Sequence, residues 1–166
     1  MPPELPDTDL PLVVVDIDGV VADVTHRLHL LDRRPRRWEE FFNAAADDPD
    51  LPEGVALVTE LPAGHALCWL TGRPERNRRI TEQWLAHHGM PDRPLLMRAD
   101  QDHRPARQAK RDHLRRLRRT HRIALVIDDD PAVIAMLTED GLPHLLADWL
   151  PYSPRLHQAQ ERHGRT

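Results

Sequence analysis

Two aspartates, Asp16 and Asp18, directly follow a short run of apolar residues, Leu12 to Val15. At this spacing along an extended strand, the two carboxylates point to the same side. Two like charges held this close together are costly unless a cation or a proton lies between them. The pair therefore predicts a divalent metal ion, an acid–base role, or both.

Polar residues also follow two later apolar runs. Thr71 and Gly72 come after one of them, and Asp128 and Asp129 come after the other. If the runs are parallel strands, their carboxyl ends lie along one edge of the sheet, which is where open α/β sheets bind ligands. We therefore expect these groups to meet the first aspartate pair in a single site.

Lys110 is the only lysine in a chain that otherwise uses arginine. An ammonium is a compact point charge, whereas a guanidinium is a wide fork. Within a helix predicted at 106–119, Leu114 and Leu117 share a face with Lys110, and this apolar face should pack on the sheet. A lysine that extends to solvent is the alternative, but the nearby acidic strand ends favour a lysine that reaches the site.

The elements that position these residues are predicted from alternating apolar runs and turn signals. Leu12 to Val15 is short and β-branched, which is typical of a strand buried on both faces of a parallel sheet. Strands are predicted at 12–17, 65–70, 95–97, 123–127 and 144–147, and helices at 53–61, 74–88, 106–119 and 131–140. This order predicts right-handed βαβ units in a Rossmann-like three-layer α/β sandwich with a mostly parallel sheet.

The length predicts one domain. We expect this domain at 12–150, after a proline-rich acidic leader at 1–11 and before a polar tail at 151–166. Residues 21–52 form a long connection that includes a short amphipathic helix beginning at Trp38. This connection has room for a flap or small cap, but not for a folded cap domain.

The composition limits the partners and the cellular compartment that can be expected for the protein. The net charge is −4, so any polyanion must be bound by local basic patches rather than by the whole-molecule field. No apolar run approaches the roughly 20 residues of a membrane-spanning helix, so no membrane partner is expected. The single cysteine, Cys68, lies in an apolar run and is expected in the core of a cytoplasmic protein.

The residue types at the predicted edge suit phosphoryl transfer through an aspartyl-phosphate. In this interpretation Asp16 attacks phosphorus, while Asp18 protonates the leaving oxygen and later activates water. A Mg²⁺ ion would be held by Asp16, by Asp18 through its main-chain carbonyl, and by the Asp128–Asp129 pair. Which of Asp128 and Asp129 binds the ion directly is left open by the sequence.

The phosphate oxygens need positive groups and hydrogen-bond donors in the transition state. Thr71, the backbone N–H groups around Gly72, and Lys110 are the candidates for this role. Three arginines expected near the edge of the site are candidates for substrate binding: Arg73, Arg98 and Arg104.

Four motifs occur in the order found in the haloacid dehalogenase (HAD) superfamily: Asp16-x-Asp18-Gly19, Thr71-Gly72-Arg73, Lys110 and Asp128-Asp129. The chain resembles phosphatases of this superfamily over residues 12–147. The resemblance implies a HAD-like fold with a minimal cap or none, Mg²⁺ as cofactor, and an acid–base role for Asp18. Val20 departs from the Thr or Ser that usually follows the motif glycine.

A narrower resemblance lies in the segment from Met97 to Pro105 followed by Lys110. This segment is similar to the 3′-phosphatase domain of phage-type polynucleotide kinases, although Gln101 replaces the usual glycine between the acids. The chain contains no G-x-x-x-x-G-K-[ST] motif. The resemblance therefore implies a phosphomonoesterase module without the kinase half, with nucleic-acid 3′ ends among its candidate substrates.

Two other functions stay open at this point. The same site could serve a nucleotidase or another small-molecule phosphatase, or the domain could be a non-catalytic regulatory or nucleic-acid-binding module. The basic run 33–37 with Trp38, Phe41 and Phe42 could contact a nucleic-acid backbone and stack on a base. Equally, these aromatic side chains could cover the core. The sequence leaves the oligomeric state open.

Overall fold

The fold was analysed in a computed structural model, which describes residues 5, 9–32, 34–151 and 153–163. Five strands form one sheet in the order β3-β2-β1-β4-β5, and every neighbouring pair is parallel. The strands are β1 (Leu12–Val15), β2 (Ala66–Pro74), β3 (Leu95–Arg98), β4 (Ile123–Asp128) and β5 (His144–Leu146). The predicted parallel α/β fold is confirmed, and β1, which precedes Asp16, is the central strand.

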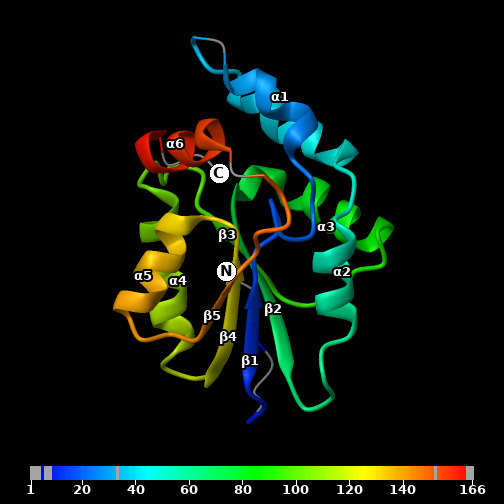
Figure 1. Cartoon of the computed structure of the whole chain (residues 1–166), viewed down its shortest axis with the longest axis vertical. Helices are drawn as coiled ribbons and strands as arrows, with labels where there is room; N and C mark the ends of the chain where they lie inside the picture. Colours follow the sequence, from blue (N-terminus) through cyan, green and yellow to red (C-terminus); the bar gives the residue numbers. More distant parts are fainter. Residues whose placement is uncertain (1–4, 6–8, 33, 152, 164–166) are drawn as a thin grey trace.

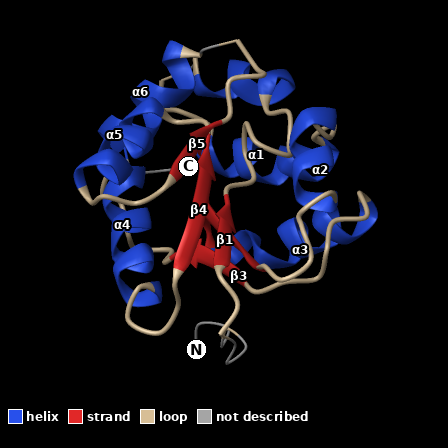
Figure 2. Ribbon diagram, turned by 60° about the horizontal axis from the view of Figure 1, so that its bottom comes forward, coloured by secondary structure: helices blue, strands red, loops and turns tan. Residues whose placement is uncertain are grey.

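Helices cover both faces of the sheet, so the molecule has the three layers that the sequence predicts (Figure 2). One face carries α2 (Pro52–Thr59) and α3 (Arg78–His87), and the other carries α4 (Ala106–Leu117) and α5 (Pro131–Glu139). Alternate residues of β1 enter different cores, because successive side chains of a strand point to opposite faces. Val13 and Val15 join the cluster beneath α2 and α3, whereas Leu12 and Val14 join the one beneath α4 and α5.

Strand β2 is longer than its apolar run predicts. Thr71, Gly72 and Arg73 are buried and continue the strand, and Pro74 pairs with Arg98 of β3 after a shift in register. A short 3-10 segment, η3 (Glu75–Asn77), then leads into α3. The predicted helix therefore begins four residues later than the expected start at Pro74, because the strand uses these residues first.

A small cap lies over the carboxyl end of the sheet (Figure 1). Its first part, called the flap below, is the connection 21–52 with η1 (Thr25–Leu31), α1 (Trp38–Asn43) and η2 (Ala44–Asp47). Its second part is α6 (Pro154–His163), which lies in the segment expected as a polar tail and packs against η1. The cap thus consists of two segments that are far apart in the sequence.

The aromatic side chains of the flap form a core of their own. Trp38, Phe41 and Phe42 are buried against one another and against Leu156 and Ala159 of α6. Their faces are therefore not available to stack on a base. Of the two roles left open by the sequence, the structure supports the one in which these aromatics cover a core.

Gly54 allows α2 to approach the loop after β1 very closely. A Cβ atom at this position would lie 1.8 Å from the Val20 carbonyl oxygen, which is far inside van der Waals contact. Gly54→Ala is therefore expected to lower the free energy of unfolding by about 1–3 kcal/mol, the usual cost of overpacking. Urea unfolding measures this change.

The control is Glu53→Gln, at the exposed neighbouring position of the same helix. It should change the free energy of unfolding by no more than about 0.5 kcal/mol. Equal midpoints for the two variants would contradict the close contact between α2 and the loop.

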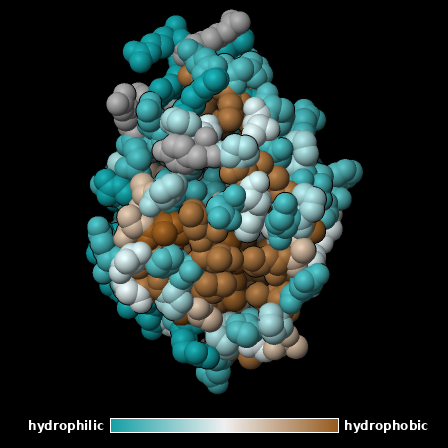
Figure 3. All heavy atoms as spheres, in the orientation of Figure 1, coloured by the Kyte–Doolittle hydropathy of each residue, from teal (hydrophilic) through white to brown (hydrophobic). Residues whose placement is uncertain are grey.

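The edge strand β5 leaves apolar side chains at the surface. In Figure 3, apolar residues gather over the strands in the middle and lower part of the face, whereas the top around α1 is largely hydrophilic. Leu145 and Leu146 of β5 are 39% and 40% exposed. Because they are successive strand residues, they point to opposite faces of the sheet. Among the described residues, no helix has the length and apolar character needed to cross a membrane.

Candidate active site

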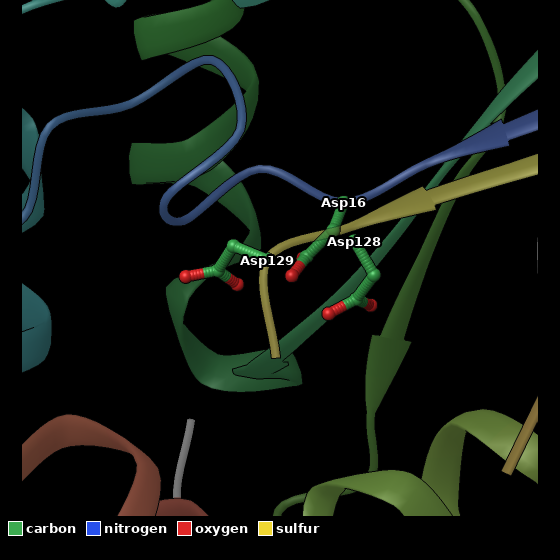
Figure 4. A group of neighbouring side chains, drawn as sticks. All are labelled: Asp16, Asp128 and Asp129. Carbon is green, nitrogen blue, oxygen red and sulfur yellow. The ribbon is translucent and has the colours of Figure 1, made fainter. Parts of the chain in front are cut away.

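Three carboxylates meet at the carboxyl edge of the two central strands. Asp16 follows β1, Asp128 ends β4, and Asp129 comes next in the chain. One oxygen of each lies within 4.8 Å of the others, and Figure 4 shows the three side chains next to one another where the two strands end. The geometry gathers one oxygen from each of these aspartates, as a divalent cation requires.

Lys110 bridges two of these carboxylates from α4. Its Nζ donates to Asp16 Oδ2 at 2.8 Å and to Asp128 Oδ2 at 2.5 Å, and the side chain is buried. Burial lowers the pKa of Lys110, but the adjacent Asp128 and Asp16 carboxylates raise it further, so the net shift is upward. The lysine is therefore a fixed positive charge between the strand ends.

The three acids are held in an environment that disfavours their joint ionisation. Burial raises the pKa of Asp16 to about 7, against the opposing effect of Lys110. Burial also raises the pKa of Asp128, and burial together with the Asp128 and Asp16 charges raises that of Asp129 well above its ordinary range. One ammonium does not neutralise three close carboxylates, so the site favours an added cation.

The hydrogen bonds distinguish Asp129 from Asp128. Asp128 uses both oxygens, accepting from the Asp130 N–H at 3.0 Å and from Lys110. Oδ1 of Asp129 is buried and has no hydrogen-bond partner among the described residues. An unpaired buried carboxylate oxygen is costly, and a hard cation such as Mg²⁺ prefers oxygen ligands. The donor set therefore fits Mg²⁺, with Asp129 offering the free oxygen.

Gly19 has two roles in the loop after β1. Its φ of +76° lies in the left-handed region that glycine adopts readily. A Cβ atom here would also lie 2.1 Å from Asp129 Oδ2. Glycine thus leaves room for the carboxylate of Asp129 beside the loop after β1.

The carboxylate of Asp18 is not part of this acidic cluster. Its Oδ1 accepts from Arg73 at 2.5 Å and from Arg27 at 2.9 Å. Burial raises the pKa of Asp18, but the two arginines outweigh burial and lower it to about 2. Asp18 is thus held as a carboxylate, the form that a general base needs. To act as an acid it must first free an oxygen from the arginines.

Two residues of this network were not found from the sequence. Arg27 of η1 binds both oxygens of Asp48 at 2.8 Å, and Arg73 also reaches Asp48 at 3.1 Å. The Arg27 guanidinium lies 4.3 Å from the centre of the Phe41 ring. Arg27 is one of many arginines, and Asp48 lies in an acidic run that resembles an exposed tip, so neither stands out in the sequence. Together they connect the flap to Asp18.

The candidate phosphate-binding and substrate-binding residues lie in different surroundings. Thr71 is buried, with Oγ1 accepting from the Arg73 N–H at 3.2 Å. Arg98 is also buried and donates to the carbonyls of Gly72 at 3.0 Å and Arg104 at 2.9 Å. The Arg104 side chain is half exposed and pairs with nearby acids. A role in substrate binding stays a prediction for these arginines. Their observed contacts give Arg73 and Arg98 structural roles.

Comparisons with known proteins agree with this geometry. The family model described as "Polynucleotide kinase PNKP phosphatase domain" matches residues 11–147. A solved structure of the Pnkp1/Rnl/Hen1 RNA repair complex contains a chain with 25% identity and a TM-score of 0.68. The alignment covers 88% of this chain and 45% of that one, so this chain spans less than half of its length.

Other solved structures share the fold at lower identity. The class C acid phosphatase of Bacillus anthracis is 16% identical with a TM-score of 0.63, covering 84% of this chain and 66% of that one. A haloacid dehalogenase-like hydrolase of Streptococcus pneumoniae is 14% identical with a TM-score of 0.59, covering 92% of both chains. A search of curated protein sequences found no match.

Proposed function

Because the chain belongs to the PNKP phosphatase domain family of the HAD superfamily, we propose that it is a Mg²⁺-dependent phosphatase acting on polynucleotide 3′ ends. The HAD fold and the family membership make it a phosphatase domain. The single observation that carries the proposed chemistry is the Asp16, Asp128 and Asp129 cluster, bridged by Lys110. The RNA repair complex that contains a similar chain supports a polynucleotide substrate.

Asp16 is the proposed nucleophile. Its Oδ1 accepts from the Ile17 N–H at 2.7 Å and its Oδ2 from Lys110, so the carboxylate is held in one orientation. As the bond from Asp16 to phosphorus forms, the bond to the leaving oxygen breaks. Asp18, which must first free an oxygen from the arginines and take up a proton, supplies that proton to the leaving oxygen. Asp18 then takes a proton from the water that attacks phosphorus, and Asp16 is released. Thr71, the backbone around Gly72 and Lys110 bind the phosphate oxygens.

Asp16 and Asp129 are the side chains proposed to hold Mg²⁺ directly. Asp129 is chosen because it carries the unpaired oxygen, and Asp16 because it is the proposed nucleophile, although its two oxygens, like those of Asp128, already accept hydrogen bonds. The main-chain carbonyl of Asp18 is a further proposed ligand. When bound, the ion supplies positive charge that offsets the carboxylates and polarises the phosphate.

Magnesium is expected to raise the thermal midpoint of the protein, because a ligand that binds only the folded state stabilises it by about 2.7 kcal/mol at one hundred times its Kd. Asp129→Asn should abolish this shift. Without magnesium, the same variant should melt at or above the wild-type midpoint, since it removes one of three close carboxylates. Differential scanning calorimetry measures both effects.

Asp92→Asn, at an exposed loop position, is the matched control and should keep the magnesium-dependent shift. An undiminished shift in Asp129→Asn would remove this residue from the proposed ligand set.

The substrate is tested by Mg²⁺-dependent phosphate release from four compounds: a 3′-phosphorylated oligonucleotide, its 5′-phosphorylated counterpart, mononucleotides and an aryl phosphate. The proposal expects the highest kcat/KM for the 3′-phosphorylated oligonucleotide. A preference for mononucleotides would instead favour a nucleotidase with the same machinery. Absence of release from all four compounds would contradict phosphatase activity altogether.

A further inference from the structure

A pocket of about 370 Å³ lies next to the acidic cluster, between η1, the segment after β5 and α6. Asp129 borders it, so the pocket and the candidate metal site share one side chain. Leu28, Leu146 and Leu150 supply apolar walls, and Thr25 adds a hydroxyl at the surface. The volume lies within the range of small-molecule binding sites.

The pocket is placed to receive the group that leaves the phosphate. The 3-10 segment η1 contributes residues both to the active site and to the pocket. Arg27 of this segment binds Asp18, the proposed proton donor to the leaving oxygen, while its neighbour Leu28 lines the pocket. Asp129 borders the pocket from the metal side. The pocket is thus bounded by η1, whose Arg27 binds the proton donor, and by Asp129 of the acidic cluster, which would hold Mg²⁺ beside the phosphate.

The lining indicates an uncharged occupant. Among the described residues, no lysine or arginine lines the pocket. Its acids are Asp129 and Asp148, and its imidazole, that of His157, lies 3.5 Å from Asp130 Oδ1. A second phosphate of a nucleic-acid backbone would therefore be repelled. A nucleobase has apolar faces and hydrogen-bonding edges, which match leucine walls with a few hydroxyl and carboxylate groups. Enzymes that accommodate a single base in a pocket use this combination.

We infer that this pocket binds the base and sugar of the 3′-terminal nucleoside, whose 3′ oxygen carries the phosphate. The inference rests on the proposed function and names a subsite for it. The remaining nucleotides leave the pocket toward solvent. The wall that α6 supplies lies beyond residue 147, where the family match ends.

Helix α6 contacts both the flap and α4. Arg155 pairs with Asp32 of the flap at 2.7 Å, and Glu161 pairs with Arg107 of α4 at 2.9 Å. Leu156 is buried against the aromatic core of the flap. The helix is therefore tied both to the flap and to the sheet domain, and the subsite is closed on this side.

The decisive comparison uses two oligonucleotides with a 3′ phosphate that differ only in whether the terminal nucleotide carries a base or is abasic. With wild-type protein and Mg²⁺, we expect kcat/KM to be at least ten-fold higher for the substrate with the base. Leu146→Trp fills the pocket and should reduce this ratio toward one. Leu150→Trp, from another wall, should do the same and covers the case in which Leu146→Trp fails to fold.

Leu145→Trp is the matched control. Leu145 is adjacent to Leu146 and equally exposed, but it points to the other face of β5 and does not line the pocket. It should retain the wild-type ratio. A ratio near one in the wild-type protein, or equal ratios in the Leu145 and Leu146 variants, would refute the subsite while leaving the phosphatase intact. Release from an aryl phosphate but from neither oligonucleotide would refute the polynucleotide function and the subsite with it.

Discussion

Replacing Asp16 by Asn is expected to lower kcat for phosphate release by at least about 10⁴-fold, the scale of loss when a covalent nucleophile is removed. The amide is close in shape to the carboxylate, and its oxygen can still accept from the Ile17 N–H. The amide that replaces the Asp16 carboxylate is not nucleophilic enough to form the acyl phosphate. The variant should therefore fold normally and still bind substrate.

Steady-state phosphate release measures the loss, and circular dichroism verifies the fold. The matched control is again Asp92→Asn, the same chemical change at an exposed site, which should keep the wild-type rate. A rate in Asp16→Asn within a few-fold of wild type would show that another group attacks phosphorus.

Lys110→Arg is expected to lower kcat by about 10²–10³-fold, the usual cost of losing one donor to the transition-state oxygens. The ammonium lies between Asp16 and Asp128, with 2.8 Å and 2.5 Å to their oxygens. A guanidinium is wider and planar, so it cannot occupy the same point while the two strand ends keep their spacing. The charge is conserved in this variant, so the loss tests geometry rather than net charge.

Lys110→Met tests the charge itself. Removing the partner of a buried ion pair costs about 3–5 kcal/mol, because the remaining carboxylates stay buried without compensation. In the presence of a chelator, the free energy of unfolding of the variant should be lower than that of the wild type by about this amount. Added Mg²⁺ should raise the free energy of unfolding of the variant by more than it raises that of the wild type. Arg111→Lys, next in the chain but paired with Asp140 at the surface, should change neither rate nor stability appreciably.

Full activity in Lys110→Arg would refute the role of the ammonium.

The sequence could predict those site residues whose positions follow from the ends of strands or from the apolar face of a helix. The apolar run before Asp16 and the run before Asp128 define two parallel strands, and parallel strands end at a common edge. Lys110 could be placed because its helix has a single apolar face. The structure brings Asp16, Lys110, Asp128 and Asp129 together, since all four depend on regular elements whose periodicity is visible in the sequence.

The partners of Asp18 could not be predicted in the same way. Arg27 and Asp48 come from 3-10 segments of the flap and its loops, where no periodicity shows which side chain faces inward. Their burial depends on the aromatic core of the flap, which in turn needs α6. That helix has a polar composition, and the apolar side chains it buries among its described residues are Leu156 and Ala159. Tertiary contacts of this kind are not encoded in local pattern.

The strand order has a consequence for how the molecule opens. Asp16 follows β1 and Asp128 ends β4, and both of these strands have neighbours on both sides, whereas the pocket residue Leu146 ends the three-residue strand β5 at the sheet edge. Segments with few neighbours exchange their amide hydrogens through local opening at low free energy, and central strands exchange only near global unfolding. On mild warming, the kcat/KM ratio between the substrate with a terminal base and the abasic substrate should therefore decrease before the turnover rate does.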